Sequence, residues 1–260
     1  MINNIKKFIV RTPLHKTALE VKASWISGNW VKENARILNN RTIYSISPYK
    51  TGTTFLASSF ESIISRHEPL HHVSVKKLNQ DFEKFFIRRL NSLNLKLECS
   101  GFLSAYVDNL AQNEIAKDLT YICILRKPSA WVTSVVNHHQ RVKEYGQNYF
   151  WGNELFWKKH AGVNLANFFM CDESEKLEVI EKLITFYISF TRKTEKLKNV
   201  KYVWINELRD FLPTLGQLIG EEVKLENSEK NKALMQKFVY TNNKIDTAYE
   251  QLVSELLSRR

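Results

Sequence analysis

The chain has 260 residues, of which 43% are hydrophobic and 12% aromatic, so it can bury a sizeable core and is not generally disordered. Its net charge of +11 fits a highly phosphorylated ligand, an acidic acceptor, a nucleic acid or an anionic membrane surface. Three cysteines without a Cys-x-x-Cys pair indicate neither a disulfide framework nor a zinc site. No stretch approaches the roughly 18–20 apolar residues of a membrane span, and we expect a cytoplasmic protein without a transmembrane segment.

The N-terminal part, residues 1–40, precedes the first clear strand and has partly helical apolar spacing. We expect it to form a helical extension. The core of the single domain is expected at residues 41–220, followed by a C-terminal helical segment at 221–260.

The first motif is a short loop between a predicted strand and a predicted helix. Residues 41–46 are mostly β-branched or aromatic, and residues 53–66 carry apolar side chains at helical spacing. In the loop, Gly52 allows a ligand to approach the backbone, and Lys50 adds a positive charge. Hydroxyls lie beside the unpaired N–H groups of the helix start at Thr51, Thr53 and Thr54. This combination predicts an anion-binding loop, and the alternative is a capped helix start with a surface lysine.

This loop does not have the Walker A order, in which the lysine follows the last glycine. Lys50 comes two residues before Gly52, so an ordinary ATPase or kinase is disfavoured.

A cluster of one carboxylate and three imidazoles follows at residues 67–72. Pro69 disfavours helix at Glu68 and is expected to stop the first helix. Glu68, His71 and His72 are therefore candidate site residues, and the alternative is a polar helix exit with solvated histidines. A metal site is disfavoured, because His67 and His71 would share a face only in a continuous helix.

The second motif follows a continuous apolar run at residues 121–125, which predicts a strand buried on both faces. Arg126 stands at its carboxyl end, where ligands bind in open α/β sheets. Pro128 suits the first turn of a helix, and Ser134 lies eight residues after Arg126. A guanidinium fork and a helix hydroxyl together predict a phosphate site. The alternative is an arginine that caps strand carbonyls and a solvated serine.

The other segments alternate between helix and strand. Helices are predicted at 80–93, 173–197, 211–219 and 244–258, and further strands at 95–97 and 200–205. Leu177, Ile180, Ile184, Tyr187 and Ile188 are expected on the buried side of the 173–197 helix. Residues 145–170 are aromatic and irregular, and form either a cover for the acceptor site or a partly helical packing segment. This order predicts an α/β fold with a central parallel sheet and helices on both faces.

The order Pro-x-Lys-Thr-Gly-Thr-Thr-x-Leu at residues 48–56 resembles the 5′-phosphosulfate loop of the sulfotransferase superfamily. The Arg-x-Pro-x-x-x-x-x-Ser pattern at 126–134 resembles that family's 3′-phosphate motif. Glu68-Pro69-Leu70 is similar to a segment of carbohydrate and bacterial sulfotransferases. The resemblance implies a three-layer P-loop NTPase-like fold and transfer of a sulfonate from 3′-phosphoadenosine 5′-phosphosulfate (PAPS) to a hydroxyl or amine. It implies no essential metal.

The resemblance also implies roles for single residues. Lys50 would neutralise charge on the leaving nucleotide, and residues 51–54 would hold the 5′-phosphate. Arg126 and Ser134 would hold the 3′-phosphate. Glu68 would accept the proton of the acceptor, with His71 or His72 as substitutes. The acceptor is expected to be a carbohydrate or glycoconjugate.

Two features depart from the family. The Glu-Lys-Ser-Pro segment of the family is altered at Cys99 and Gly101, although Glu98 or Ser100 could still face the acceptor. The Gly-rich nucleotide segment of cytosolic members has no equivalent after residue 220. Two alternatives therefore remain, a P-loop phosphotransferase or kinase and a non-catalytic basic nucleic-acid-binding protein. A nucleic acid is not expected, because Lys and Arg are dispersed rather than gathered in a stripe.

Overall fold

The computed structural model describes residues 21, 24–26, 28, 41–145, 152–224 and 237–259. For residues 141–145 it describes the backbone alone. The predicted N-terminal extension lies almost wholly outside the described residues. Within those ranges, no helix combines the length and apolar composition that a membrane span requires.

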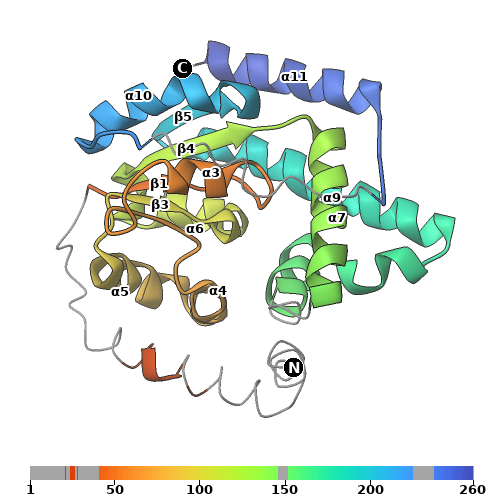
Figure 1. Ribbon diagram of the computed structural model, residues 1–260, viewed down its shortest axis with the longest axis horizontal. Helices are drawn as coiled ribbons and strands as arrows, with labels where there is room; N and C mark the ends of the chain where they lie inside the picture. The colour runs from red at the N-terminus through yellow and green to blue at the C-terminus, as the bar shows by residue number, and fades with distance from the viewer. Residues whose placement is uncertain are drawn as a thin grey trace.

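A five-stranded parallel sheet forms the centre of the protein, with the strand order β2-β3-β1-β4-β5 (Figure 1). The strands are β1 (Ile43–Ser45), β2 (Ser65–His67), β3 (Leu97–Cys99), β4 (Thr120–Leu125) and β5 (Asn199–Trp204). β1 and β4 are neighbours in the sheet. From β1 the chain continues towards one edge of the sheet, where β2 lies, and from β4 towards the other edge, where β5 lies. The strand order therefore reverses between β1 and β4. The switch point between the carboxyl ends of β1 and β4 is where open α/β sheets bind ligands.

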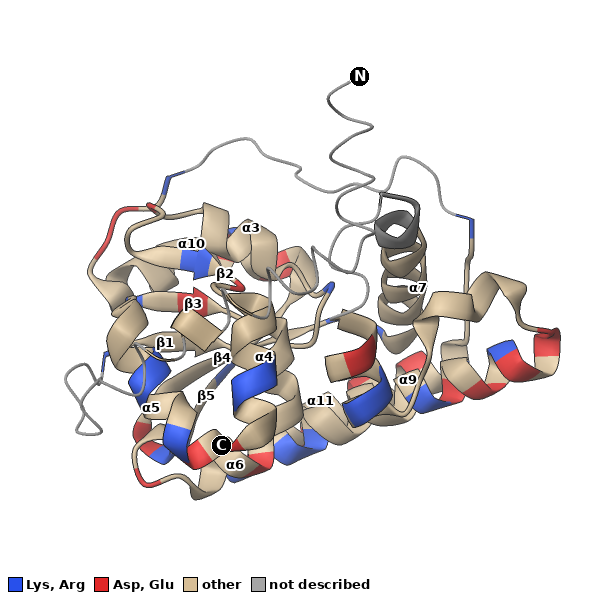
Figure 2. Ribbon diagram, turned by 90° about the horizontal axis from the view of Figure 1, so that it is seen from below, with Lys and Arg blue, Asp and Glu red and all other residues tan. Residues whose placement is uncertain are grey.

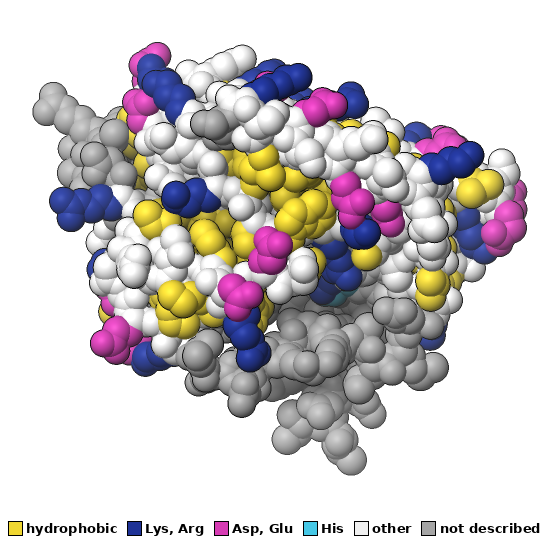
Figure 3. Space-filling view, turned by 90° about the horizontal axis from the view of Figure 1, so that it is seen from above, with side chains coloured by type: hydrophobic (Ala, Val, Ile, Leu, Met, Phe, Trp, Pro, Cys, Tyr) yellow, Lys and Arg dark blue, Asp and Glu magenta, His cyan; other side chains and the backbone are white. Residues whose placement is uncertain are grey.

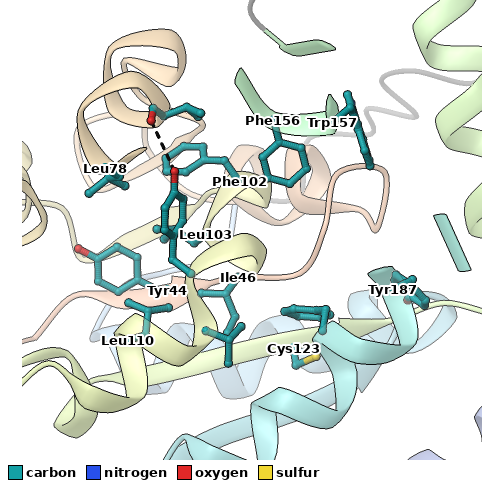
Figure 4. Close-up of a cluster of buried hydrophobic side chains, with 14 of the residues drawn as sticks. Tyr44, Ile46, Leu78, Phe102, Leu103, Leu110, Cys123, Phe156, Trp157 and Tyr187 are labelled. Carbon is teal, nitrogen blue, oxygen red and sulfur yellow. Dashed lines mark hydrogen bonds between the residues drawn. The ribbon is translucent and has the colours of Figure 1, made fainter. Parts of the chain in front are cut away.

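Both faces of the sheet are buried, because successive side chains of a strand point to opposite faces. Tyr44, Ile46, Tyr121 and Cys123 contribute to one core, which is shown in Figure 4. Ile43, Leu97, Ile122 and Ile124 contribute to the other. The sheet thus lies between two apolar layers, as the predicted three-layer α/β fold requires.

Most helices cover the first face. These are α4 (His71–Gln80), α5 (Phe82–Leu93), α6 (Val107–Gln112), α7 (Pro128–Tyr145), α9 (Glu173–Lys193) and α11 (Asn243–Ser258). The opposite face is covered by α3 (Thr53–Ser58) and α10 (Leu208–Ile219). α10 ends at Gly220, whose φ of 65° closes the helix in the left-handed conformation.

The helix predicted over residues 53–66 is wrong in its second half. α3 has six residues and ends at Ser58. The hydroxyls of Ser58 and Ser59 both donate to the carbonyl of Phe55, which offers the backbone an alternative to further helix. The chain then turns into β2, so Pro69 does not stop the first helix.

Residues 152–170 form short helical segments, at Gly152–Ala161 and Leu165–Met170. Phe156, Trp157 and Phe168 are each at most 1% exposed, so this part is a partly helical packing segment. The helix predicted at 173–197 is confirmed as α9, but Leu177 is 57% exposed and does not lie on its buried side.

Candidate active site

The two predicted phosphate motifs meet at the switch point of the sheet. Lys50 follows β1 and Arg126 follows β4, and these strands are neighbours with Ser45 opposite Ile122. The Arg126 guanidinium donates a hydrogen bond of 2.7 Å to the carbonyl oxygen of Lys50. Tyr187 of α9 fixes the Arg126 backbone, since its hydroxyl accepts from the N–H at 2.9 Å and donates to the carbonyl at 3.0 Å. The two motifs therefore lie next to each other at the carboxyl edge of the sheet.

The loop after β1 has an unusual backbone. Lys50 has a φ of 71°, in the left-handed region that non-glycine residues seldom occupy. Gly52 has a φ of 98°, and a Cβ atom there would lie 2.7 Å from Cδ1 of Leu208. Rare backbone conformations of this kind are found preferentially at ligand sites, where the surrounding structure holds them.

The anion-binding groups of the loop differ in their availability. Thr51 is fully buried, and its hydroxyl donates to the carbonyl of Pro48 at 2.8 Å, so this side chain stabilises the loop instead of offering its hydroxyl to a ligand. At the start of α3, no side chain of the described residues caps the N–H groups of the first turn. Because α3 has only six residues, we assign anion binding to the loop groups and Lys50 rather than to a helix dipole.

Thr53 and Thr54 connect the loop to the end of β2. Both hydroxyls lie 3.2 Å from Nε2 of His67. The same nitrogen lies 3.8 Å from a carboxylate oxygen of Glu68. Burial and then the charge of Lys50 lower the pKa of His67 to about 4, so this imidazole is neutral at pH 7.

Glu68 lies beside the loop, as its candidate role requires. Its φ of 47° is again left-handed, and its N–H donates to the carbonyl of Cys99 at 3.0 Å. Burial raises the pKa of Glu68 to about 8, against the lowering effects of the Gly101 N–H and of Lys50. The carboxyl group is therefore mostly protonated at neutral pH.

Glu98 and Ser100 do not face an acceptor, which corrects the expectation drawn from the sequence. Glu98 is 1% exposed and binds the fully buried Arg89 through two hydrogen bonds of 2.7 Å. Ser100 donates to the same carboxylate. Arg89 also donates to the carbonyl of Pro69 at 3.2 Å, so this ion pair fixes the turn that carries Glu68.

His71 and His72 begin α4 on the other side of this turn. Nε2 of His71 lies 2.6 Å from the hydroxyl of Tyr49, the residue before Lys50. Burial, and then the neighbouring His72, lower the pKa of His71 to about 3. Burial raises the pKa of Tyr49, so its phenol donates to a neutral His71. His71 thus stabilises the loop, and it holds the ring of Tyr49 in place.

α7 carries Ser134, the other residue that is predicted to bind a phosphate, and this helix contacts the loop directly. Ser134 is half-buried on this helix. Trp131, one turn earlier, donates from Nε1 to the carbonyl of Tyr49 at 2.8 Å and stacks on Tyr187 at 4.5 Å between ring centroids. The helix that contains Ser134 is therefore fixed against the residue that precedes Lys50.

Sequence analysis missed a fourth histidine of this region. His139 of α7 is 8% exposed, and the charge of Lys50, after burial, contributes to lowering its pKa to about 3. The signal in the sequence was the His138-His139 pair in the helix that begins just after Arg126. In Figure 3, a His surface is visible beside Lys or Arg side chains in a hollow of the face seen from above.

The aromatic segment at Gly152–Ala161 packs against the loop. The rings of Phe156 and Trp157 lie 4.7 and 5.7 Å from the Tyr49 ring. Phe156 also contacts His160, which lines a cavity of about 410 Å³ together with Lys159, Lys182 and Phe186. The Phe156 ring therefore contacts both Tyr49 and a residue that lines this cavity. A larger cavity of about 620 Å³ lies at the amino ends of β4 and β5, at the edge of the sheet away from Lys50.

Among the residues that the structure describes, no three His, Cys, Asp or Glu side chains are arranged to hold a metal ion. His67 lies at the end of β2 and His71 at the start of α4, so they do not share a helix face. Comparison of the chain with protein-family models, curated proteins and solved structures gives no match. Its function is therefore inferred from the residues and their geometry.

Proposed function

We propose that the protein is a sulfotransferase that moves a sulfonate group from PAPS to a hydroxyl or amine of an acceptor. The observation that carries this proposal is the 2.7 Å hydrogen bond between Arg126 and Lys50, which joins two motifs 76 residues apart. Each motif alone is a common pattern, whereas their contact at the switch point supports a single site for a polyanion.

The donor would bind across this contact. Lys50 and the N–H groups of residues 51–54 offer positive charge and hydrogen bonds to the 5′-phosphosulfate. An arginine has five N–H donors, so Arg126 can bind a phosphate while it holds the carbonyl of Lys50. Ser134 is the hydroxyl assigned to the same 3′-phosphate. No described feature assigns the adenine.

Sulfonate transfer between oxygens depends on positioning and on charge stabilisation, as phosphoryl transfer does. Lys50 would stabilise the negative charge that grows on the leaving phosphate oxygen. The acceptor's proton must pass to a base, and Glu68 is the base suggested by the resemblance. With a pKa of about 8, only about a tenth of Glu68 is ionised at pH 7.

The acceptor class and the compartment are part of the proposal. Glu68-Pro69-Leu70, similar to a segment of carbohydrate and bacterial sulfotransferases, supports a sugar hydroxyl. Cys99, Cys123 and Cys171 form no disulfide bond, which fits a reducing compartment such as the cytoplasm.

The charge distribution does not favour the nucleic-acid alternative. Along α9, basic and acidic residues are interspersed (Figure 2), and Lys176 and Lys182 pair with Glu173 and Glu178. A binding protein for nucleic acid would instead present a basic stripe.

Calorimetric binding of 3′-phosphoadenosine 5′-phosphate (PAP), the product nucleotide, tests the donor site beside ADP and ATP without metal. We expect clear preference for PAP, and loss of that preference in Arg126→Ala. Preference for ATP would favour the phosphotransferase, and a folded protein that binds no nucleotide would overturn the proposal.

A further inference from the structure

The imidazole of His139 has a buried nitrogen whose environment the protein itself does not explain. The side chain is 8% exposed, and its Nδ1 has no hydrogen-bond partner within the part of the chain that the structure describes. Trp157 contacts the ring edge-on at 5.5 Å, and Cε1 lies 3.9 Å from the position of a Cβ atom on Gly152. Buried polar atoms are nearly always hydrogen-bonded, so an orphaned one requires an explanation, and a catalytic role is one of those known for such groups.

The position of His139 connects it to the transfer site. Lys50 influences the ionisation of His139 on α7 and also that of His67 and Glu68 at the end of β2. The ammonium group therefore lies within electrostatic reach of both elements. Trp157 lies 5.7 Å from the Tyr49 ring and 5.5 Å from His139, which places this imidazole and the Lys50 loop around one indole.

We propose that His139 is a catalytic residue whose Nδ1 accepts the proton of the acceptor hydroxyl. The inference rests on the proposed sulfotransferase function and names the base for it. Nδ1 can accept a proton when the ring carries its own hydrogen on Nε2.

The step balances without any further reactant. The acceptor oxygen forms a bond to sulfur, and its proton moves to Nδ1 of His139. The bond between sulfur and the bridging phosphate oxygen breaks, and its electron pair stays on that oxygen, where Lys50 stabilises the charge. The products are the sulfated acceptor and PAP, and the imidazolium later returns its proton to water.

The charge of the donor distinguishes His139 from Glu68 as a base. Burial and the ammonium of Lys50 hold His139 neutral, with a pKa of about 3, whereas burial holds Glu68 protonated below pH 8. A bound polyanion offsets the charge of Lys50 and raises the pKa of both groups. This change makes His139 a stronger base that is still neutral, but it keeps Glu68 protonated and unable to accept a proton.

Release of PAP from PAPS, with water in place of the acceptor, tests the inference without knowledge of the natural acceptor. His139→Asn keeps a hydrogen-bonding atom near the position of Nδ1 but cannot accept a proton. We expect its rate to fall about 10²-fold or more, with PAP affinity within threefold of wild type. His138→Asn, its more exposed neighbour on α7, is the matched control and should keep the wild-type rate.

The pH profile and Glu68→Gln give the second readout. We expect the wild-type rate to be constant from pH 6 to pH 9, and Glu68→Gln to retain most of it. A wild-type rate in His139→Asn would overturn the inference, as would a rate that rises through pH 8 and is lost in Glu68→Gln. Absence of PAP binding by the wild-type protein would instead overturn the sulfotransferase proposal itself, so the two failures are distinguishable.

Discussion

The carbonyl oxygen of Lys50 accepts a hydrogen bond of 2.7 Å from the guanidinium of Arg126. This bond crosses between the loops that follow β1 and β4, and it holds Lys50 in a left-handed conformation with a φ of 71°. Arg126 is itself fixed by the hydroxyl of Tyr187. A single side chain can therefore bind one phosphate of the proposed donor and also shape the loop that is proposed to bind the other.

Replacement of Arg126 should weaken PAP binding more than ADP binding. If Arg126 binds the 3′-phosphate as proposed, Arg126→Ala removes charge-assisted hydrogen bonds to it, each worth about 1.5–3 kcal/mol, so we expect PAP affinity to fall about 10–100-fold. Lys127→Ala is the control, because Lys127 is more than half exposed and pairs with Glu250. Calorimetry with both nucleotides measures the effect. Equal losses for PAP and ADP would show that Arg126 acts only on the loop.

Lys50→Met should change the ionisation of its neighbours as well as turnover. The charge of Lys50 helps to lower the pKa of His67, which is about 4, so its removal should raise that pKa. The new value should stay below the ordinary one, because burial is the larger cause. Titration by NMR of the imidazole signals measures this shift, and Lys96→Met, which removes a lysine paired with Glu221, is the control. We also expect PAPS turnover to fall about 10²–10³-fold. An unchanged pKa would place the ammonium away from β2.

Gly52→Ala should destabilise the protein more than Gly162→Ala does. Both glycines have positive φ, at 98° and 66°, so an alanine in either position costs about 1–2 kcal/mol in backbone strain. At Gly52 the added Cβ atom would also lie 2.7 Å from Leu208, whereas no atom lies within 4 Å of it at Gly162. Urea unfolding measures both free energies. Equal losses would mean that α10 moves away from the loop without cost.

Elements with strong periodicity could be predicted from the sequence. The apolar spacing of residues 80–93 predicted a helix, and α5 confirms it, with Phe82, Phe85, Phe86 and Leu90 each at most 6% exposed. β2 was missed because Ser65–His67 is short and polar, and it pairs only with β3 at the edge of the sheet. Its pairing is a tertiary property that three such residues cannot signal.

The candidate site was predictable only where its residues follow strands that the sequence itself predicts. Lys50 and Arg126 each follow a buried strand, and parallel strands bring their carboxyl ends to one edge, so their proximity followed from the fold. The roles of Thr51, Glu98 and His139 did not follow. Each depends on burial or on a contact that the sequence does not signal: Thr51 is buried and bonds to the carbonyl of Pro48, Glu98 pairs with Arg89, and His139 packs against Trp157.

The Arg89–Glu98 ion pair should be essential only as a pair. Arg89→Met leaves the Glu98 carboxylate buried without its partner, and we expect a loss of about 3–5 kcal/mol in the free energy of unfolding. The double variant Arg89→Met/Glu98→Leu removes both charges and should recover most of this loss. Because Arg89 also binds the carbonyl of Pro69, we expect the double variant to have a more mobile Glu68 turn and slower PAPS turnover. A double variant as unstable as the single one would show that the other bonds of Arg89 dominate.

Acid should destabilise the protein partly through His139. Removal of this imidazole should weaken the dependence of the free energy of unfolding on pH. Burial and Lys50 lower its pKa to about 3 in the folded state, against about 6.5 in the unfolded chain, so the unfolded state binds more protons between these values. The stability that His139 contributes is complete above pH 6.5 and is lost as the pH falls towards 3. At pH 5 the loss amounts to about 2 kcal/mol relative to pH 7.

We therefore expect His139→Asn and His139→Phe to lose about 2 kcal/mol less than wild type between pH 7 and pH 5, measured by urea unfolding within each variant. Because each variant serves as its own reference at pH 7, any change in packing cancels. If the free energy of unfolding of both variants depends on pH as it does in wild type, the imidazole is accessible to protons in the folded protein. His139 would then not be a buried neutral base.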